Sequence, residues 1–182
     1  MELNFSRDWE FAETPLDTPY IDIADHEWNH VDLPHDFLIT DVKNLYRDAT
    51  GWYRKRFSVP DIPAGEHLFL SFDGLYMDSR FYLNGEPLGE WKYGYSACLL
   101  DLTEKLLYGE ENILIVSVRH QSPNSRWYSG AGIFRKVKLI KKPATYLVPQ
   151  GIYFHAEKIK HTGPKDSAQD EWEVTLRAEI DG

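Results

Sequence analysis

Tyr82-Leu83-Asn84-Gly85-Glu86-Pro87-Leu88 is the stretch of this sequence that decides its fold class. Asn-Gly stands between two strand-like runs, and both residues tolerate the positive φ angles of a tight two-residue turn. The stretch therefore predicts a β-hairpin, and it sets the pattern against which the rest of the chain is compared.

Short runs rich in Val, Ile, Phe, Tyr and Trp recur outward from this hairpin between Gly, Pro, Asn and Asp residues. Such runs are typical of antiparallel strands. They predict strands at residues 9–13, 52–59, 67–73, 79–84, 88–93, 112–119, 133–140 and 145–154. Residues 102–111 predict a short helix, with Thr103 as its cap and Gly109 as its stop. Proline-rich residues 14–50 predict a long ordered loop.

The predicted fold is all-β: a jelly-roll, galactose-binding-like β-sandwich whose two sheets bury alternate residues against each other. A domain boundary is expected near residues 141–143 (KKP), which gives a complete domain at 1–142 and a remainder at 143–182. The remainder holds strand candidates at 146–156 and 172–180, separated by a polar stretch at 161–170. About 40 residues are too few for a seven-stranded sandwich, so we expect the chain to be part of a longer protein.

The 182 residues include 20 Lys and Arg against 29 Asp and Glu, a formal net charge of −9. This balance argues against nucleic acid as a partner, because nucleic-acid-binding proteins concentrate basic residues. No apolar stretch approaches the ~18 residues of a membrane span, and no secretory signal is recognisable. The single cysteine, Cys98, cannot form an intrachain disulfide. We therefore expect a cytoplasmic protein without a membrane partner.

Residues 26–30 (HEWNH) match the H-E-x-x-H pattern of zinc peptidases. That chemistry needs His26 and His30 one turn apart on a helix, where both bind the metal. Pro19 and Pro34 argue against a helix here. A zinc peptidase therefore stays only as a remote alternative, and we expect neither a metal nor a cofactor.

Residues 124–129 (NSRWYS) are the first place to look for a binding site. Arg126, Trp127 and Tyr128 adjoin in a Ser-rich and Gly-rich loop, where no periodicity buries all three. Sugar sites combine aromatic faces with polar groups that fix the hydroxyls, and loops carry function on sandwiches. Pairs of carboxylates, which glycoside hydrolysis requires, are too numerous among the 29 acidic residues for the sequence to select one.

Six motifs in a fixed order give the chain a family likeness. They are residues 28–37 (WNHVDLPHDF), 51–57 (GWYRKRF), 72–79 (FDGLYMDS), 82–85 (YLNG), 93–96 (YGYS) and 125–135 (SRWYSGAGIFR). Together they resemble the N-terminal part of glycoside hydrolase family 2, which includes many β-galactosidases, over roughly residues 3 to 142.

The resemblance implies a non-catalytic, sugar-binding jelly roll from a retaining, β-galactosidase-like enzyme, followed by the beginning of an immunoglobulin-like sandwich. The family's two catalytic Glu residues belong to a barrel further along, so this chain is not expected to hydrolyse a substrate by itself. The implied partners are a β-galactoside and the remaining domains of the parent chain.

The resemblance also implies which residues line the rim of the sugar pocket. Arg126 corresponds to a position near the sugar, although several relatives have Asp there, and Trp127 and Tyr128 follow it. Asp36 could accept hydrogen bonds from sugar hydroxyls, or it could anchor the 14–50 loop through backbone N–H groups. An autonomous carbohydrate-binding module, with an aromatic patch of its own, remains the alternative function.

Overall fold

The computed structural model describes residues 1–23, 26–162 and 169–182. The described residues form strands almost throughout, with a single short 3-10 helix, η1 (Tyr20–Ile23). The strands are β1 (Glu2–Asn4), β2 (Trp9–Thr14), β3 (Asn29–Val31), β4 (Ala49–Ser58), β5 (His67–Phe72), β6 (Ser79–Leu83), β7 (Glu86–Trp91), β8 (Cys98–Asp101), β9 (Glu111–His120), β10 (Val137–Lys142), β11 (Tyr146–Thr162) and β12 (Gln169–Asp181). The all-β prediction is confirmed.

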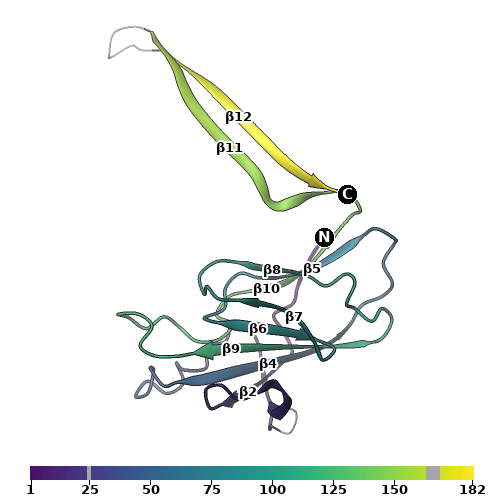
Figure 1. Cartoon of the computed structure of the whole chain (residues 1–182), viewed down its shortest axis with the longest axis vertical. Helices are drawn as coiled ribbons and strands as arrows, with labels where there is room; N and C mark the ends of the chain where they lie inside the picture. Colours follow the sequence, from purple (N-terminus) through teal and green to yellow (C-terminus); the bar gives the residue numbers. More distant parts are fainter. Residues whose placement is uncertain (24–25, 163–168) are drawn as a thin grey trace. The chain divides into compact units, whose positions relative to one another are not determined.

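The chain divides into two compact units, Met1–Lys141 and Lys142–Gly182. The first unit is a sandwich of two sheets, drawn in Figure 1 as two stacked layers. One sheet has the order β3-β2-β4-β9-β6-β7, and the other has the order β1-β10-β5-β8. Strands far apart in sequence become neighbours, as where Glu2 pairs with Ile140.

The predicted hairpin forms as expected. β6 and β7 pair in an antiparallel register that matches Leu83 with Glu86. The two residues between them, Asn84 and Gly85, have φ angles of 53° and 88°. Both values belong to the mirror-image turns that fit the twist of a hairpin, so the local sequence and the local structure agree.

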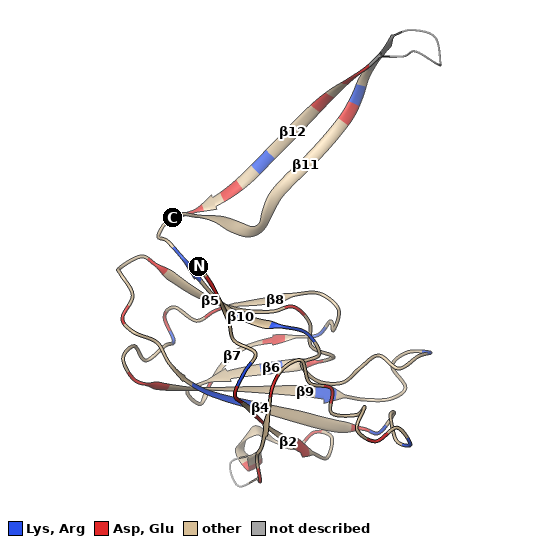
Figure 2. Cartoon of the chain, turned by 180° about the vertical axis from the view of Figure 1, so that it is seen from behind, with Lys and Arg blue, Asp and Glu red and all other residues tan. Residues whose placement is uncertain are grey.

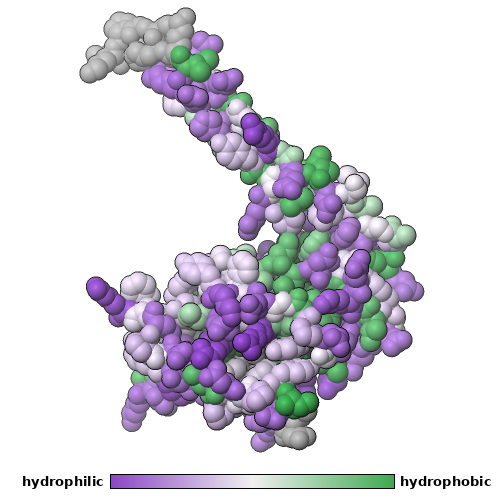
Figure 3. Space-filling model, viewed as in Figure 1, coloured by the Kyte–Doolittle hydropathy of each residue, from purple (hydrophilic) through white to green (hydrophobic). Residues whose placement is uncertain are grey.

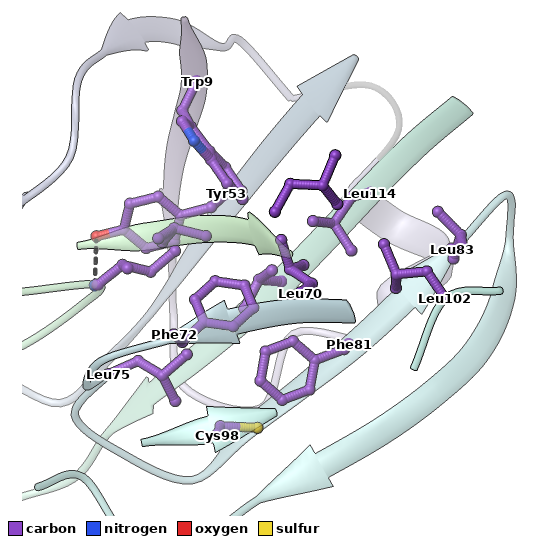
Figure 4. Close-up of a cluster of buried hydrophobic side chains, with 14 of the residues drawn as sticks. Trp9, Tyr53, Leu70, Phe72, Leu75, Phe81, Leu83, Cys98, Leu102 and Leu114 are labelled. Carbon is purple, nitrogen blue, oxygen red and sulfur yellow. Dashed lines mark hydrogen bonds between the residues drawn. The ribbon is translucent and has the colours of Figure 1, made fainter. Parts of the chain in front are cut away.

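The core lies between the two sheets (Figure 4), where the labelled side chains point toward one another. Strands β4, β6 and β9 send alternate residues into it, among them Tyr53, Phe81 and Val116, each fully buried. Burial of such side chains is the main stabilising contribution to a sandwich, at roughly 1.5–3 kcal/mol each. The residues between them point to the other face of the six-stranded sheet.

The helix predicted at residues 102–111 does not form, and the structure shows turns there instead. The side chain of Asn112, fully buried, pairs with both the N–H and the carbonyl of Leu107 at 2.9 Å. Thr103 caps no helix, because its Oγ1 accepts the N–H of Leu68 at 3.0 Å. The N–H of Gly109 donates to the carbonyl of Val59. Contacts with other elements thus take the backbone groups that a helix would need.

Strand boundaries differ from the predictions at three short strands and one long one. β1, β3 and β8 have only three or four residues each and were not predicted. The strand predicted at 133–140 begins only at Val137. The backbone of Ile133 makes its hydrogen bonds outside a strand: its carbonyl accepts the N–H of His35 at 2.8 Å, and its own N–H donates to the hydroxyl of Tyr53.

The second unit is the antiparallel hairpin of β11 and β12. Residues directly opposite each other share a face, which puts the pairs Leu147–Ile180, Phe154–Leu176 and Ala156–Val174 on one side and Tyr153–Arg177 and Glu157–Glu173 on the other. The apolar side is uncovered, with Leu176 67% exposed, and Figure 3 shows apolar residues at the surface of the hairpin. Residues 163–168 of the predicted polar stretch lie outside the described residues.

Charged residues of both signs are interspersed along the strands (Figure 2), and no element is uniformly basic. Within the described part of the chain, no helix is long and apolar enough to cross a membrane.

Candidate functional site

The loop between β9 and β10 is held in place by a network of short polar side chains. Ser125 Oγ lies 2.6 Å from Ser129 Oγ, and Asn124 Nδ2 donates to the carbonyl of Gln121 at 3.0 Å. The buried ring of His120 lies between this loop and the neighbouring one, with Nδ1 2.9 Å from the carbonyl of Arg47 and Nε2 3.2 Å from Asn124 Nδ2. A carbonyl only accepts and an amide nitrogen only donates. The ring of His120 therefore bridges a carbonyl of one loop and a side-chain amide of the other.

Arg126 and Trp127 extend from this rigid loop into open solvent. Trp127 is 63% exposed, and Arg126 is exposed as well. Neither side chain makes a hydrogen bond, an ion pair or a ring contact with any residue that the structure describes. A guanidinium with five donors and no partner is free to bind a ligand.

Both side chains line a groove with a volume of about 510 Å³, called the aromatic groove below. Its lining residues are Tyr76, Met77, Lys92, Tyr93, Gly94, Tyr95, Asn124, Ser125, Arg126, Trp127 and Ser129. Tyr95 is fixed among other rings, 5.2 Å from Tyr76 and 6.0 Å from Phe134, and its hydroxyl donates to the carbonyl of Ser129. Tyr93 is 63% exposed. The groove thus offers aromatic surface beside an unpaired cation.

Asp36 and Tyr128, the other two predicted site residues, meet in a different arrangement. The hydroxyl of Tyr128 donates to Asp36 Oδ1, and the same oxygen accepts the N–H groups of Leu38 and Ile39 at 3.1 and 3.4 Å. Burial and the neighbouring carboxylate of Asp36 raise the pKa of Tyr128. Neither residue lines the aromatic groove. The anchoring role weighed for Asp36 is therefore present in the structure.

The backbone on both sides of Asp36 is hydrogen-bonded to residues 131–133, which follow the 124–129 loop. His35 and Phe37 donate their N–H groups to the carbonyls of Ile133 and Ala131. Gly132, between them, has a φ of 110°, and a Cβ there would lie 2.2 Å from the hydroxyl of Tyr53. This close-packed arrangement of His35, Asp36, Tyr53, Tyr128 and Gly132 is called the Asp36 corner below.

Two titratable groups of the corner are shifted by burial. His35 Nδ1 lies 3.0 Å from the hydroxyl of Tyr53. Burial lowers the pKa of His35 below 6.5 and raises the pKa of Tyr53 well above 10.0. Both shifts favour the neutral form, so the contact between His35 and Tyr53 is one between uncharged groups at neutral pH.

The zinc-peptidase alternative is wrong, because the helix it requires is not formed. Asn29–Val31 is strand β3, which pairs with β2 and places His30 opposite Glu10. His26 lies in a bend outside that strand, and its Nδ1 is 3.0 Å from the carbonyl of Asp22. Two histidines placed in this way do not share a helix face, so the motif match is coincidental.

The sequence is matched by the family model for "Glycosyl hydrolases family 2, sugar binding domain" over residues 20–143. The chain belongs to glycosyl hydrolase family 2. The resemblance drawn from the ordered motifs is therefore confirmed.

Among curated proteins, a β-galactosidase of Bacteroides ovatus is 40% identical over 82% of this chain, which corresponds to 19% of the relative. A putative β-glucuronidase of Formosa agariphila is 29% identical over the whole chain, or 18% of that relative. Among solved structures, a β-glycosidase from Bacteroides vulgatus superposes with a TM-score of 0.76 at 26% identity, and the match covers 100% of this chain and 24% of that one. The chain thus spans about a fifth of the length of these curated relatives.

The sequence prediction missed Tyr93 and Tyr95 as site residues. Both lie in the motif at 93–96, which was noted for its family likeness and not for binding. The sequence signal that could have found them is a pair of tyrosines on either side of Gly94. The strand predicted at 88–93 hid it, because that strand included Tyr93, whereas β7 ends at Trp91.

Proposed function

We propose that this chain is the non-catalytic sugar-binding domain at the N-terminal end of a longer, retaining glycoside hydrolase. The match to the sugar-binding domain of family 2 over residues 20–143 carries this proposal. The length of the relatives supports it, because the matched segment is about a fifth of each. Catalysis then belongs to the remaining domains of the parent chain, which are the expected partners of this one.

The aromatic groove is the surface that we assign to the rim of the sugar pocket. Arg126 and Trp127 are held out by a rigid loop, and neither has a partner among the described residues. The planar guanidinium suits pairs of sugar hydroxyls, and an exposed indole suits the apolar face of a pyranose ring. Tyr93 and Tyr95 extend the same surface.

Asp36 and Tyr128, which do not line the aromatic groove, are proposed to contribute to the sugar pocket next to it. Asp36 Oδ1 is used by Tyr128 and two backbone N–H groups, whereas Oδ2 makes no hydrogen bond with the described residues. Oδ2 is the atom left to accept a sugar hydroxyl, so Asp36 combines anchoring with binding. Tyr128 fixes the carboxylate that would make this contact.

The substrate class that we propose is a β-galactoside. The relative at 40% identity is a β-galactosidase, while the Formosa agariphila relative at 29% identity is named a putative β-glucuronidase. The higher identity favours galactoside. A cytoplasmic location is part of the same proposal, since the single cysteine, Cys98, is buried and free and the fold needs no disulfide.

Residues 143–182 are proposed to begin an immunoglobulin-like sandwich that follows a jelly roll at 1–142. The β11–β12 hairpin has one apolar face, and two strands alone are marginally stable in water. Further strands that cover Phe154, Val174 and Leu176 would complete a second core.

A titration of the isolated chain separates this function from an autonomous carbohydrate-binding module. The exposed rings of Tyr93 and Trp127 favour that second candidate, which predicts saturable micromolar binding of galactosides or neutral galacto-oligosaccharides. The proposed domain role predicts no saturable binding of these neutral ligands by the chain alone, but binding and turnover by the longer enzyme. Micromolar binding that Trp127→Ala abolishes would overturn the domain role.

A further inference from the structure

A second cavity lies on the outer face of the six-stranded sheet, apart from the aromatic groove. Its volume is about 370 Å³, and it shares no lining residue with the groove. We call it the outer cavity; it is lined by Asp17, Thr18, Pro19, Tyr20, Thr50, Trp52, Asp78, Arg80, Tyr82, Ser117 and Arg119. Its size falls in the usual range for small-molecule sites, roughly 300–1,000 Å³.

The floor of the outer cavity comes from strands β4, β9 and β6. Ser117 is paired with Trp52 on one side and with Arg80 on the other, so the three residues form a row across the sheet. Thr50 lies in the next row, opposite Arg119. Because side chains alternate along a strand, all of these point away from the core that Tyr53 and Phe81 fill.

Two buried residues on this floor keep their hydroxyl oxygens open to the cavity. Thr50 is 4% exposed and Ser117 is 6% exposed. Neither hydroxyl makes a hydrogen bond with any described residue. Both residues line the cavity, so their hydroxyls are available to a polar ligand that enters it.

The walls add polar groups that are held in fixed positions. Tyr20 of η1 stacks on Tyr82 with ring centroids 4.1 Å apart, and neither hydroxyl has a partner in the described part of the chain. On the opposite side, Arg119 Nε donates to Asp17 at 2.8 Å and Nη1 donates to Gln121 at 2.8 Å. Stacking and ion pairing fix both walls before a ligand enters.

Arg80 is a charged residue of the outer cavity that has no ion-pair partner within the described residues. Its side chain is exposed, and it has neither an ion pair nor a hydrogen bond within the described residues. Its cross-strand neighbour Glu90 is held by Lys92 at 3.2 Å. The wall carboxylates are also paired, Asp17 with Arg119 and Asp78 with Lys92. Arg80 is thus left to bind an anionic group.

We propose that the outer cavity binds a sugar unit that carries a carboxylate. Arg80 binds the carboxylate, for which its guanidinium is suited. The hydroxyls of Thr50 and Ser117, with those of Tyr20 and Tyr82, bind the hydroxyl groups of the ring. A uronate can bind both Arg80, through its carboxylate, and the cavity hydroxyls, through its ring hydroxyls. A neutral hexose leaves Arg80 without an ion pair, and a simple carboxylate leaves the hydroxyls of the floor without a ligand partner.

A third hollow has lining residues in common with both the outer cavity and the aromatic groove. A hollow of about 370 Å³ shares Asp78 and Arg119 with the cavity, and it shares Met77 and Asn124 with the groove. We infer that one oligosaccharide contacts both sites through this hollow. This connection rests on the proposed function of the groove, while the cavity's own affinity for a uronate does not.

The test is a titration of the full 182-residue chain, followed by NMR, with D-glucuronate, D-glucose and acetate. We expect saturable binding of glucuronate, with glucose and acetate each weaker by about tenfold or more. Arg80→Gln should reduce the affinity for glucuronate by about tenfold or more. Ser117→Ala should weaken glucuronate binding with the acetate response unchanged. Arg56→Gln, at an exposed arginine that pairs with Glu111 outside the cavity, should leave glucuronate binding unchanged.

Equal affinity for all three probes, no saturable binding of glucuronate, or unaltered binding in Arg80→Gln would overturn the proposal. Loss of binding in Arg126→Gln but not in Arg80→Gln would place the uronate in the aromatic groove. That result would also overturn the outer cavity as a site, while it would support the proposed function of the groove.

Discussion

The Asp36 corner and the aromatic groove adjoin in sequence, since Tyr128 belongs to one and Trp127 to the other. Their side chains differ in environment: those of the corner are packed and hydrogen-bonded, whereas Arg126 and Trp127 of the groove are exposed. In the corner, Asp36 Oδ1 takes a hydroxyl and two backbone N–H groups, and Gly132 leaves no room for a Cβ. In the groove, Arg126 has no partner among the described residues and Trp127 is 63% exposed. Polar groups whose hydrogen bonds are formed within the protein stabilise its structure. Exposed groups that have no partner within the protein are available to a ligand.

The largest effect is expected in the corner, from Gly132→Ala. The new Cβ would lie 2.2 Å from the Tyr53 hydroxyl and 2.8 Å from the carbonyl of His35, at a φ of 110°. The free energy of unfolding should fall by about 3 kcal/mol or more, measured by denaturant unfolding. Gly85→Ala is the control, because Gly85 has a φ of 88° but nothing within 4 Å; it should cost only about 1–2 kcal/mol. Equal losses would refute the steric argument.

Asp36→Ala should have the next largest effect on stability. It removes the acceptor for Tyr128 and for the N–H groups of Leu38 and Ile39, which should cost about 1–3 kcal/mol. Tyr128→Phe removes one of these bonds and should cost about 1 kcal/mol. If the two variants were equally stable, the backbone contacts of Asp36 would contribute nothing.

The pH dependence of stability should reveal the corner through His35. Burial lowers its pKa below 6.5 in the folded state, so the unfolded chain binds the proton more readily. The free energy of unfolding should therefore fall as the pH drops below about 6.5, and it should level off below the folded-state pKa. His35→Asn should reduce the difference in urea midpoint between about pH 7.5 and pH 5.5. An unchanged difference would mean that another group causes the pH dependence.

The smallest effect on stability is expected in the groove. Trp127 makes no ring contact with the described residues and is 63% exposed, so Trp127→Ala should change the free energy of unfolding by no more than about 0.5 kcal/mol. A loss comparable to that of Asp36→Ala would show that Trp127 is structural, and the contrast between groove and corner would disappear.

The sequence predicted what local pattern controls. Asn84 and Gly85 specify their turn by themselves, and alternating runs located the long strands. The structure differs from the sequence predictions where contacts with other segments determine the local conformation. Asn112 holds Leu107 in a turn instead of a helix, and β1 forms because Glu2 pairs with Ile140. Three-residue strands have too little pattern of their own to be recognised.

The residues of the candidate site could be grouped only in part from the sequence, for the same reason. The loop at 124–129 was recognised from its composition, and the structure places Arg126 and Trp127 together in the groove. That Tyr128 turns away to Asp36, 92 residues earlier in the chain, depends on a tertiary contact that neither segment reveals alone. The outer cavity combines η1 with three strands, so no single motif could have indicated it.

Arg126→Ala, made in the longer enzyme that carries this chain and measured as kcat/KM on an aryl β-galactoside, tests the central claim most directly. We predict that kcat/KM falls by an amount equivalent to about 1–3 kcal/mol, because a charged hydrogen bond to the sugar is lost. The free energy of unfolding should change by less than about 0.5 kcal/mol, since Arg126 is exposed and makes no hydrogen bond or ion pair within the described chain. An unchanged kcat/KM would contradict the account and remove Arg126 from the sugar site.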